Sequence, residues 1–201
     1  MSYAFTVPVA SPDPFHEPRR KFTADEVYRM LDAGILEEGP GLELLEGDLV
    51  VMSPQGAPHA GFAELLRERL LQALGPGHNA RTHAPVDAGP YSQPEPDVAV
   101  VRGRPEDYLT RHPTAADTLL VVEVARSSLP RDRRKARIYA QARFPEYWLF
   151  DVEQRSVLVH RDPDGVSSYG QVLTLGAADR LAVPGTPAEL DLAALFALLP
   201  A

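Results

Sequence analysis

The sequence predicts a single domain of the α/β (α+β) class, with helices around one mixed sheet. Its length of 201 residues suits one hydrophobic core. Apolar residues recur at spacings of three and four in some segments and form short continuous runs in others, so both helices and buried strands are expected. These segments follow the order helix, three strands, helix and strand, with an additional helix and hairpin at the N-terminal side, which is typical of helices packed on a mixed sheet.

The N-terminal part divides into an arm and the start of the domain. The first 20 residues hold four prolines and no hydrophobic periodicity. Residues 1–21 are therefore expected to form an extended or flexible arm, and residues 22–201 the domain. Thr23 and Glu26 form a capping-box pattern that precedes an apolar stripe, which predicts a helix over 24–33.

The remaining elements follow from changes of pattern along the chain. The turn residues 46–48 separate two apolar runs within 41–52, which predicts a hairpin. Apolar residues spaced at three and four from 58 to 74 predict an amphipathic helix that ends at Gly75. Further strands are predicted over 81–88, 97–101, 118–125, 146–151 and 156–160, and further helices over 131–143 and 190–199.

Composition and charge exclude several classes of function. The chain has no cysteine, which excludes disulfides, thiolate metal sites and a cysteine nucleophile. The 28 acidic and 20 basic residues give a formal net charge of −8, which argues against a protein that coats nucleic acid, although a local basic groove or a metal ion would still attract phosphate. There is no secretory leader and no apolar run of about 18 residues, so a cytoplasmic protein without a membrane partner is expected.

Glu123 is the most informative single residue of the sequence. It interrupts the apolar run 119–125, where both faces of a strand are expected to be buried. An ionised carboxylate without a partner is very unfavourable in such a place. Glu123 is therefore expected to pair with an arginine such as Arg126 or Arg131, to hold a proton, or to serve as a metal ligand or catalytic carboxylate.

Asp97 is the expected companion of Glu123. It follows the proline-containing turn 92–96 at the start of a buried strand. Carboxylates at corresponding ends of adjacent strands converge on a hard cation such as Mg²⁺, which takes oxygen ligands and keeps several waters. An aspartate in this position is as often a turn residue when taken alone, and the pairing with Glu123 is what favours a metal site.

Lys135 is one of only two lysines among the 20 basic residues. In the predicted helix it shares a stripe with Ile138, Tyr139 and Ala142, and this stripe is expected to face the sheet. A buried ammonium suits a general base or a charge that positions water. The alternative is a lysine that lines the edge of the core and extends its head into solvent. Tyr139 is either a hydrogen-bond donor in the site or a core tyrosine.

Four segments of the chain carry a family resemblance: Gln93-Pro-Glu-Pro-Asp97-Val-Ala-Val-Val, Leu120-Val-Val-Glu123-Val, Arg131-Asp132-x-x-Lys135-x-x-x-Tyr139 and Phe144-Pro-Glu-Tyr-Trp-Leu149. Together they resemble the bacterial Uma-two family, which belongs to the restriction-endonuclease-like PD-(D/E)XK nuclease superfamily. The resemblance covers roughly residues 22–197 and includes an upstream Leu42-Glu43-Leu-Leu-Glu46 and His59. It implies a core of helix, three strands, helix and strand, and hydrolysis of phosphodiester bonds, most often in DNA.

The resemblance also implies a role for each member of the candidate site. Asp97 and Glu123 would bind Mg²⁺ or Mn²⁺ with the carbonyl group of Val124 as a third ligand, and the ion would activate water. Lys135 would orient or deprotonate that water. The superfamily usually has a lysine two residues after the glutamate, but this position is Ala125 here. Lys135 would therefore have to bring its ammonium to the same place from the following helix.

Two residues upstream of the core are further catalytic candidates. The resemblance implies that Glu43 contacts the metal or water and that His59 contacts phosphate or water. The alternative for Glu43, and more so for Glu46, is a hairpin acid exposed to solvent. The alternative for His59 is a histidine that caps a helix.

The expected partner is nucleic acid, and two alternatives remain open. Arg126, Arg131 and Arg134 belong to the one local basic cluster and are expected to contact the phosphate backbone. The alternative is a solvated helix face paired with acids. A homodimer is expected by analogy, because cleavage of both strands needs two sites. The competing function is a catalytically silent nuclease fold that serves as a binding or assembly module, with the charged residues in a buried ion-pair network, and Ala125 and the net charge favour it.

Overall fold

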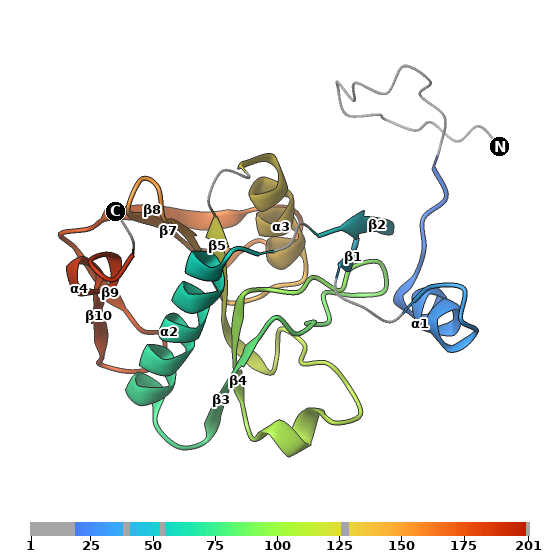
Figure 1. The fold of residues 1–201 in the computed structure, drawn as a ribbon, viewed down its shortest axis with the longest axis horizontal. Coiled ribbons are helices and arrows are strands. Elements are labelled where there is room, and N and C mark those ends of the chain that lie inside the picture. Colours follow the sequence, from blue (N-terminus) through green and yellow to red (C-terminus); the bar gives the residue numbers. More distant parts are fainter. Residues whose placement is uncertain (1–18, 38–40, 53–54, 126–128, 200–201) are drawn as a thin grey trace.

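The computed structural model describes residues 19–37, 41–52, 55–125 and 129–199, and its centre is a six-stranded sheet (Figure 1). In spatial order the strands are β3 (His78–Thr82), β4 (Val98–Arg102), β5 (Thr118–Ala125), β6 (Glu146–Asp151), β7 (Ser156–Pro163) and β8 (Tyr169–Gly176). The other elements are α1 (Ala24–Asp32), β1 (Leu42–Leu45), β2 (Asp48–Val51), α2 (Ala57–Leu74), η1 (Pro105–Tyr108), α3 (Leu129–Gln141), β9 (Arg180–Ala182), β10 (Glu189–Asp191) and α4 (Leu192–Phe196). Only β5 and β6 are parallel neighbours, and α3 forms the crossover between them. The mixed sheet with flanking helices confirms the predicted fold class.

Helices cover both faces of the sheet and divide the core into two layers. Val98 and Phe62 of α2 belong to one buried apolar cluster, which also contains α4. The next residue of β4, Ala99, belongs to a second cluster with Tyr139 of α3. Successive strand residues point to opposite faces. Odd-numbered positions around the start of β4, and therefore Asp97, face α3.

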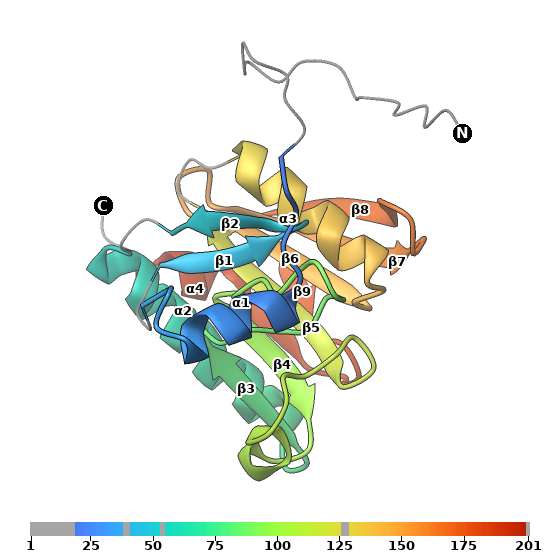
Figure 2. The same ribbon diagram turned by 90° about the vertical axis from the view of Figure 1, so that its right-hand side faces the viewer.

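The predicted hairpin, β1 and β2, lies beside α3, because Glu46 and Asp48 both contact Arg134 of that helix. Its turn places Glu46 and Gly47 at φ values of 51° and 81°, and two consecutive positive values are what a type I′ turn requires. A Cβ atom at Gly47 would lie 2.6 Å from Cβ of Lys21, so only glycine fits there. Figure 2 shows the hairpin between α1 and α3.

The N-terminal helix α1 confirms the capping-box prediction. The Thr23 side chain accepts a hydrogen bond from the Glu26 backbone, and the Glu26 carboxylate accepts one from the Thr23 backbone. Residues 1–18 of the predicted arm lie outside the described residues. Among the described ranges, no helix is long and apolar enough to cross a membrane.

The bounds predicted for the first strand of the sheet, 81–88, are wrong. This strand, β3, begins at His78 and ends at Thr82. His83 adopts a φ of 48°, which interrupts the extended conformation, and Pro85 follows in a segment without regular structure. The shift matters for the site because it places His83 in the turn that leaves the sheet.

The C-terminal region holds more strands than the sequence predicts. Strands β8, β9 and β10 and the short helix η1 were not expected. Val172 and Leu173 of the edge strand β8 are both exposed, so the strand has no alternation of apolar and polar residues to reveal it. The last helix, predicted over 190–199, covers only 192–196, because β10 occupies the preceding positions and Asp191 caps the helix by accepting a hydrogen bond from the Ala194 backbone.

Candidate active site

The two predicted carboxylates face each other across neighbouring strands. Asp97 directly precedes β4, and Glu123 lies in β5. The β4–β5 register pairs Val98 with Val122, and its continuation by one residue places Asp97 opposite Glu123. Asp97 is 4% exposed and Glu123 is 7% exposed. The backbone N–H of Val124 donates a 2.7 Å hydrogen bond to Asp97 Oδ2, which ties the two strands together at this point.

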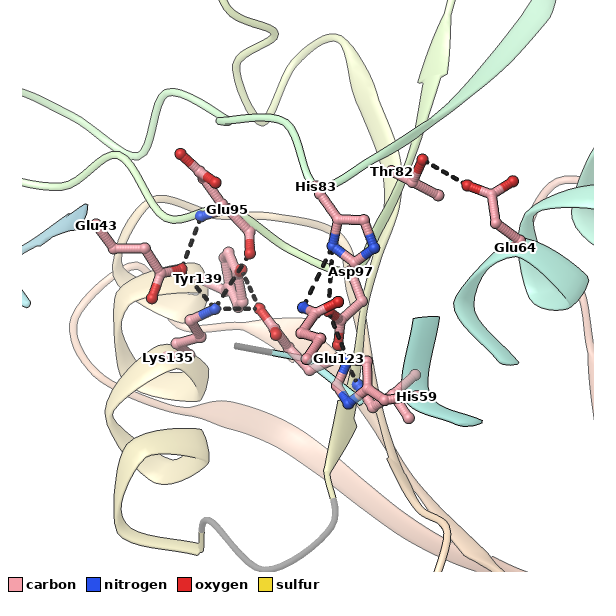
Figure 3. Close-up of polar contacts among 12 residues, drawn as sticks. Glu43, His59, Glu64, Thr82, His83, Glu95, Asp97, Glu123, Lys135 and Tyr139 are labelled. Carbon is pink, nitrogen blue, oxygen red and sulfur yellow. Dashed lines mark hydrogen bonds and ion pairs between the residues drawn. The ribbon is translucent and has the colours of Figure 1, made fainter. Parts of the chain in front are cut away.

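Lys135 reaches the carboxylates from α3, and its side chain points inward as its helical spacing predicts (Figure 3). The residue is 3% exposed, so its head does not extend into solvent. Its Nζ lies 2.6 Å from Glu43 Oε1 and 2.9 Å from Glu123 Oε1, and it donates a 3.3 Å hydrogen bond to the backbone carbonyl of Glu95. Three acceptors from three parts of the chain thus match the three protons of the ammonium.

Glu43 and Tyr139 complete the surroundings of this ammonium. Glu43 is 1% exposed and accepts a 2.9 Å hydrogen bond from the Glu95 backbone, so it belongs to the buried cluster and is not a solvent-exposed hairpin acid. The Tyr139 hydroxyl donates a 2.7 Å hydrogen bond to Glu123 Oε1, the oxygen that Lys135 also contacts. No side chain or backbone group of the described ranges donates a hydrogen bond to the other oxygen, Oε2.

Nitrogen-containing side chains surround Asp97 on the side away from Lys135. Gln55 Nε2 donates a 2.9 Å hydrogen bond to Asp97 Oδ1. His59 Nε2 lies 2.9 Å from the same oxygen without the alignment of a hydrogen bond, and His83 Nδ1 lies 3.6 Å from it. The position of His59 rules out the role of helix cap, because Gly56 occupies that place in α2.

Gln55 and His83 are members of this site that the sequence did not indicate. Both lie in segments between regular elements, and neither belongs to an apolar pattern. The positive φ of His83 is rare for a residue with a side chain, and such backbone conformations gather at functional sites. This backbone conformation could have been found only from the structure, because no glycine or asparagine marks the position.

Burial and charge set the protonation of the cluster. Burial raises the pKa of Glu123, and the charges of Asp97 and Glu43 act in the same direction against the opposing effect of Lys135. Burial also acts to raise the pKa of Asp97, but the contacts with His59 and a backbone N–H outweigh it and lower the pKa. Burial acts to lower the pKa of Lys135, but the charges of Glu123 and Glu43 raise it. Lys135 is therefore an ammonium, and Glu123 takes up a proton more readily than Asp97 does.

This protonation predicts a pH dependence of stability in the metal-free protein. A carboxyl group with a higher pKa in the folded state binds more protons when folded. Through Glu123 the free energy of unfolding should therefore fall, by up to about 1.4 kcal/mol per pH unit, as the pH rises from the ordinary value of 4.5 through the raised pKa. Urea unfolding in EDTA at about pH 6 and pH 8 is expected to show a smaller loss for Glu123→Gln than for the wild type. Equal losses would contradict a raised pKa, and Glu64→Gln, at a largely exposed position, is the control.

The similarity of the chain to known proteins identifies its family. The sequence model of the Uma2 family, described as "Putative restriction endonuclease", matches residues 24–195. The chain belongs to the Uma2 family. Its fold is similar to that of a crystal structure described as "a putative nuclease belonging to DUF820" from Anabaena variabilis ATCC 29413, with a TM-score of 0.73 and 18% sequence identity over 89% of this chain and 99% of that one. No curated protein matches the chain. The family and the nuclease fold inferred from the sequence are thereby confirmed.

The basic cluster that was expected to bind nucleic acid in this Uma2 chain lies on and before α3. Arg134 Nε is 3.0 Å from Glu46 Oε2, and its Nη2 is 2.7 Å from Asp48 Oδ2. Arg126 and the side chain of Arg131 lie outside the described residues. The described part of the cluster is therefore neutralised by acids of the hairpin turn.

The oxygen atoms of the Uma2 site suit a hard divalent cation. Among the described residues, no three side chains of histidine, cysteine, aspartate or glutamate are grouped so that they could hold a metal ion. A cation here would depend on Asp97, Glu123, backbone oxygen and water, and Mg²⁺ retains waters when it binds. Glu43, Asp97 and Glu123 are three buried carboxylates beside one ammonium, Lys135. When fully ionised they carry an excess of two negative charges, which a divalent cation would neutralise.

Proposed function

We propose that this Uma2 protein is a metal-dependent endonuclease that hydrolyses phosphodiester bonds, with DNA as its substrate. The observation that supports the proposal most is the buried pair of Asp97 and Glu123, with the ammonium of Lys135 2.9 Å from Glu123. A hard cation such as Mg²⁺ takes oxygen ligands, and a bound cation assists hydrolysis by activating water and stabilising negative charge. The description of the family as a restriction endonuclease points to nucleic acid as the substrate.

Asp97, Glu123 and the carbonyl oxygen of Val124 would hold the cation, which is Mg²⁺ or Mn²⁺ in this proposal. When bound, such a cation lowers the pKa of a water ligand and stabilises negative charge on the phosphate. Asp97 is prepared for this role, because Gln55 and His59 contact one of its oxygens and a backbone N–H the other. Its lowered pKa keeps it ionised at neutral pH.

Lys135 would orient the attacking water or the phosphate. An ammonium with a raised pKa has no free electron pair at neutral pH, so orientation is favoured over the proton abstraction that the sequence left open. The longest of its contacts, 3.3 Å to the Glu95 carbonyl, is the one most easily exchanged for a substrate oxygen. Glu43 would hold the ammonium during this exchange, and His59 would contact phosphate or water beside Asp97.

Cleavage assays test this proposal directly. Plasmid DNA, single-stranded DNA and RNA of the same sequence are incubated with the wild-type protein and Mg²⁺, Mn²⁺ or EDTA. Cleavage of DNA that depends on the cation is the expected result. Cleavage of RNA alone would overturn the choice of substrate, and cleavage in EDTA would overturn the role of the metal.

A binding or assembly module is the second candidate function, and the contacts of Lys135 favour it. All three contacts of Lys135 are internal, and the usual lysine position holds Ala125. A silent site could be an ion-pair network with no room for a cation. Calorimetric titration of the wild type with Mn²⁺ separates the two functions, because the nuclease is expected to bind the cation and the ion-pair network is not.

The homodimer expected from the sequence remains a proposal, and the edge strand β8 offers a surface for it. In the described sheet β8 pairs only with β7, and its eight residues carry no charge. Unprotected edge strands of this kind pair readily with a second strand. We expect a dimer in analytical ultracentrifugation that dissociates when Val172→Lys places a charge on this edge. Val166→Lys, at an exposed position between β7 and β8, is the control, and dimers in both variants would exclude this edge.

A further inference from the structure

Arg81 lies on the same face of the sheet as the candidate active site. It is the fourth residue of β3 and pairs with Ala99 of β4, which belongs to the apolar cluster under α3. Directly paired residues share a face, so Arg81 points to the side that holds Asp97. Asp97 precedes Ala99 by two residues, and two strand residues span about 6.6 Å. His83, two residues after Arg81, already contacts Asp97. Arg81 is thus the next residue along this face from the site.

Arg81 has no counterion in the described part of the chain. Its Nη1 atom is buried and makes no hydrogen bond. The guanidinium lies 5.8 Å from the ring centre of Tyr108, and no ion pair to a carboxylate is present among the described residues. Arg111, which lies over the same ring, is by contrast paired with Asp117 at 2.6 Å. Arg134, in the basic cluster that the sequence emphasised, is likewise neutralised.

A partly buried guanidinium without an anion is unfavourable, because burial removes its water and no protein group replaces it. Tyr108 offers a ring face, which compensates only in part. The side chain of Arg81 remains partly exposed, so an anion from outside can reach it. A phosphate group matches the planar fork of the guanidinium with two parallel hydrogen bonds.

We propose that Arg81 binds a backbone phosphate of the nucleic acid, next to the phosphate that is cleaved at Asp97. This inference rests on the proposed nuclease function and adds a substrate contact to it. Arg81 then holds the register of the strand in the site and takes no part in bond cleavage. The unpaired guanidinium is kept on this face because the substrate supplies the missing anion.

The test is DNA binding as a function of salt. Fluorescence anisotropy with labelled single-stranded and duplex DNA, in Ca²⁺ to suppress cleavage, is measured for the wild type and Arg81→Gln between about 50 and 200 mM salt. We expect Arg81→Gln to bind several-fold more weakly and to reduce the slope of log affinity against log salt by about 1. The matched control is Arg69→Gln, which removes the same charge from α2 on the opposite face and should change neither quantity.

A conservative variant separates substrate binding from a structural role. Arg81→Lys keeps the charge and should retain the salt slope, while its melting temperature should stay near that of the wild type. If wild-type protein binds DNA but Arg81→Gln binds with the same affinity and slope, the inference is wrong and the nuclease proposal stands. If Arg81→Gln lowers the melting temperature and leaves the slope unchanged, Arg81 supports the fold through Tyr108 only, and the inference is also overturned. Absence of DNA binding by the wild type would overturn the nuclease proposal together with the inference.

Discussion

Asp97→Asn is expected to reduce cation-dependent DNA cleavage by at least about 10²-fold to 10³-fold, the loss typical of one removed electrostatic contact in an active site. Asparagine keeps the size of the side chain but removes the negative charge that would bind the cation. It also brings an amide beside Gln55 and His59, which now face a carboxylate oxygen. Calorimetric titration with Mn²⁺ should show a matching loss of affinity. Cleavage and cation affinity are therefore expected to fall together.

The control for this variant is Glu64→Gln. Glu64 lies on α2, is largely exposed, and accepts a hydrogen bond from Thr82 on the face of the sheet away from Asp97. Its neutralisation removes one negative charge from the neighbourhood without touching the cluster. Cleavage that survives Asp97→Asn, or falls equally in both variants, would show that Asp97 does not hold the cation.

The sequence predicted the members of the site that lie in strongly patterned elements. Glu123 was recognised because an acid stands out in an apolar strand, and the orientation of Lys135 followed from its spacing to Ile138 and Tyr139. Burial of Glu123 and Lys135 confirms these placements. Asp97 could be recognised as a candidate ligand only together with Glu123, because an aspartate after a proline turn has several common roles. Patterned elements reveal their buried face, so a polar residue on that face can be found without the structure.

The rest of the site could not be predicted because it depends on contacts between distant segments. Gln55 contacts Asp97 across 42 positions, and the Glu95 carbonyl accepts from Lys135 across 40. A loop amide or a backbone carbonyl has no sequence pattern that marks it. The ion pairs of the arginines on α3 could not be predicted for a related reason. A local run of basic residues does not show that Glu46, in a turn 88 residues before Arg134, neutralises it.

Lys135→Met is expected to lower the free energy of unfolding by about 3–5 kcal/mol in EDTA at neutral pH. Removal of one partner from a buried ion pair leaves an uncompensated charge. Here the Glu43 carboxylate loses the Lys135 ammonium, and Glu123, whose pKa is raised, loses a hydrogen-bond donor. Cleavage should be lost as well. If the protein is a metal-dependent nuclease, the affinity of the variant for Mn²⁺ should rise, because the site keeps its carboxylates and no longer holds a competing ammonium.

Stability measurements with and without Mn²⁺ then decide between the two candidate functions. A cation that binds only the folded state raises the melting temperature more when it binds more tightly, so a nuclease site predicts a larger rise for Lys135→Met than for the wild type. Adding Glu43→Gln to Lys135→Met removes the carboxylate that lies 2.6 Å from the Lys135 ammonium in the wild type, and it should recover part of the lost stability without Mn²⁺. A silent ion-pair network predicts the same initial loss and the same recovery, but no rise with Mn²⁺ in any variant. The buried charge of Glu43, Glu123 and Lys135 is common to both functions, and only the response to the cation distinguishes a catalytic site from a structural one.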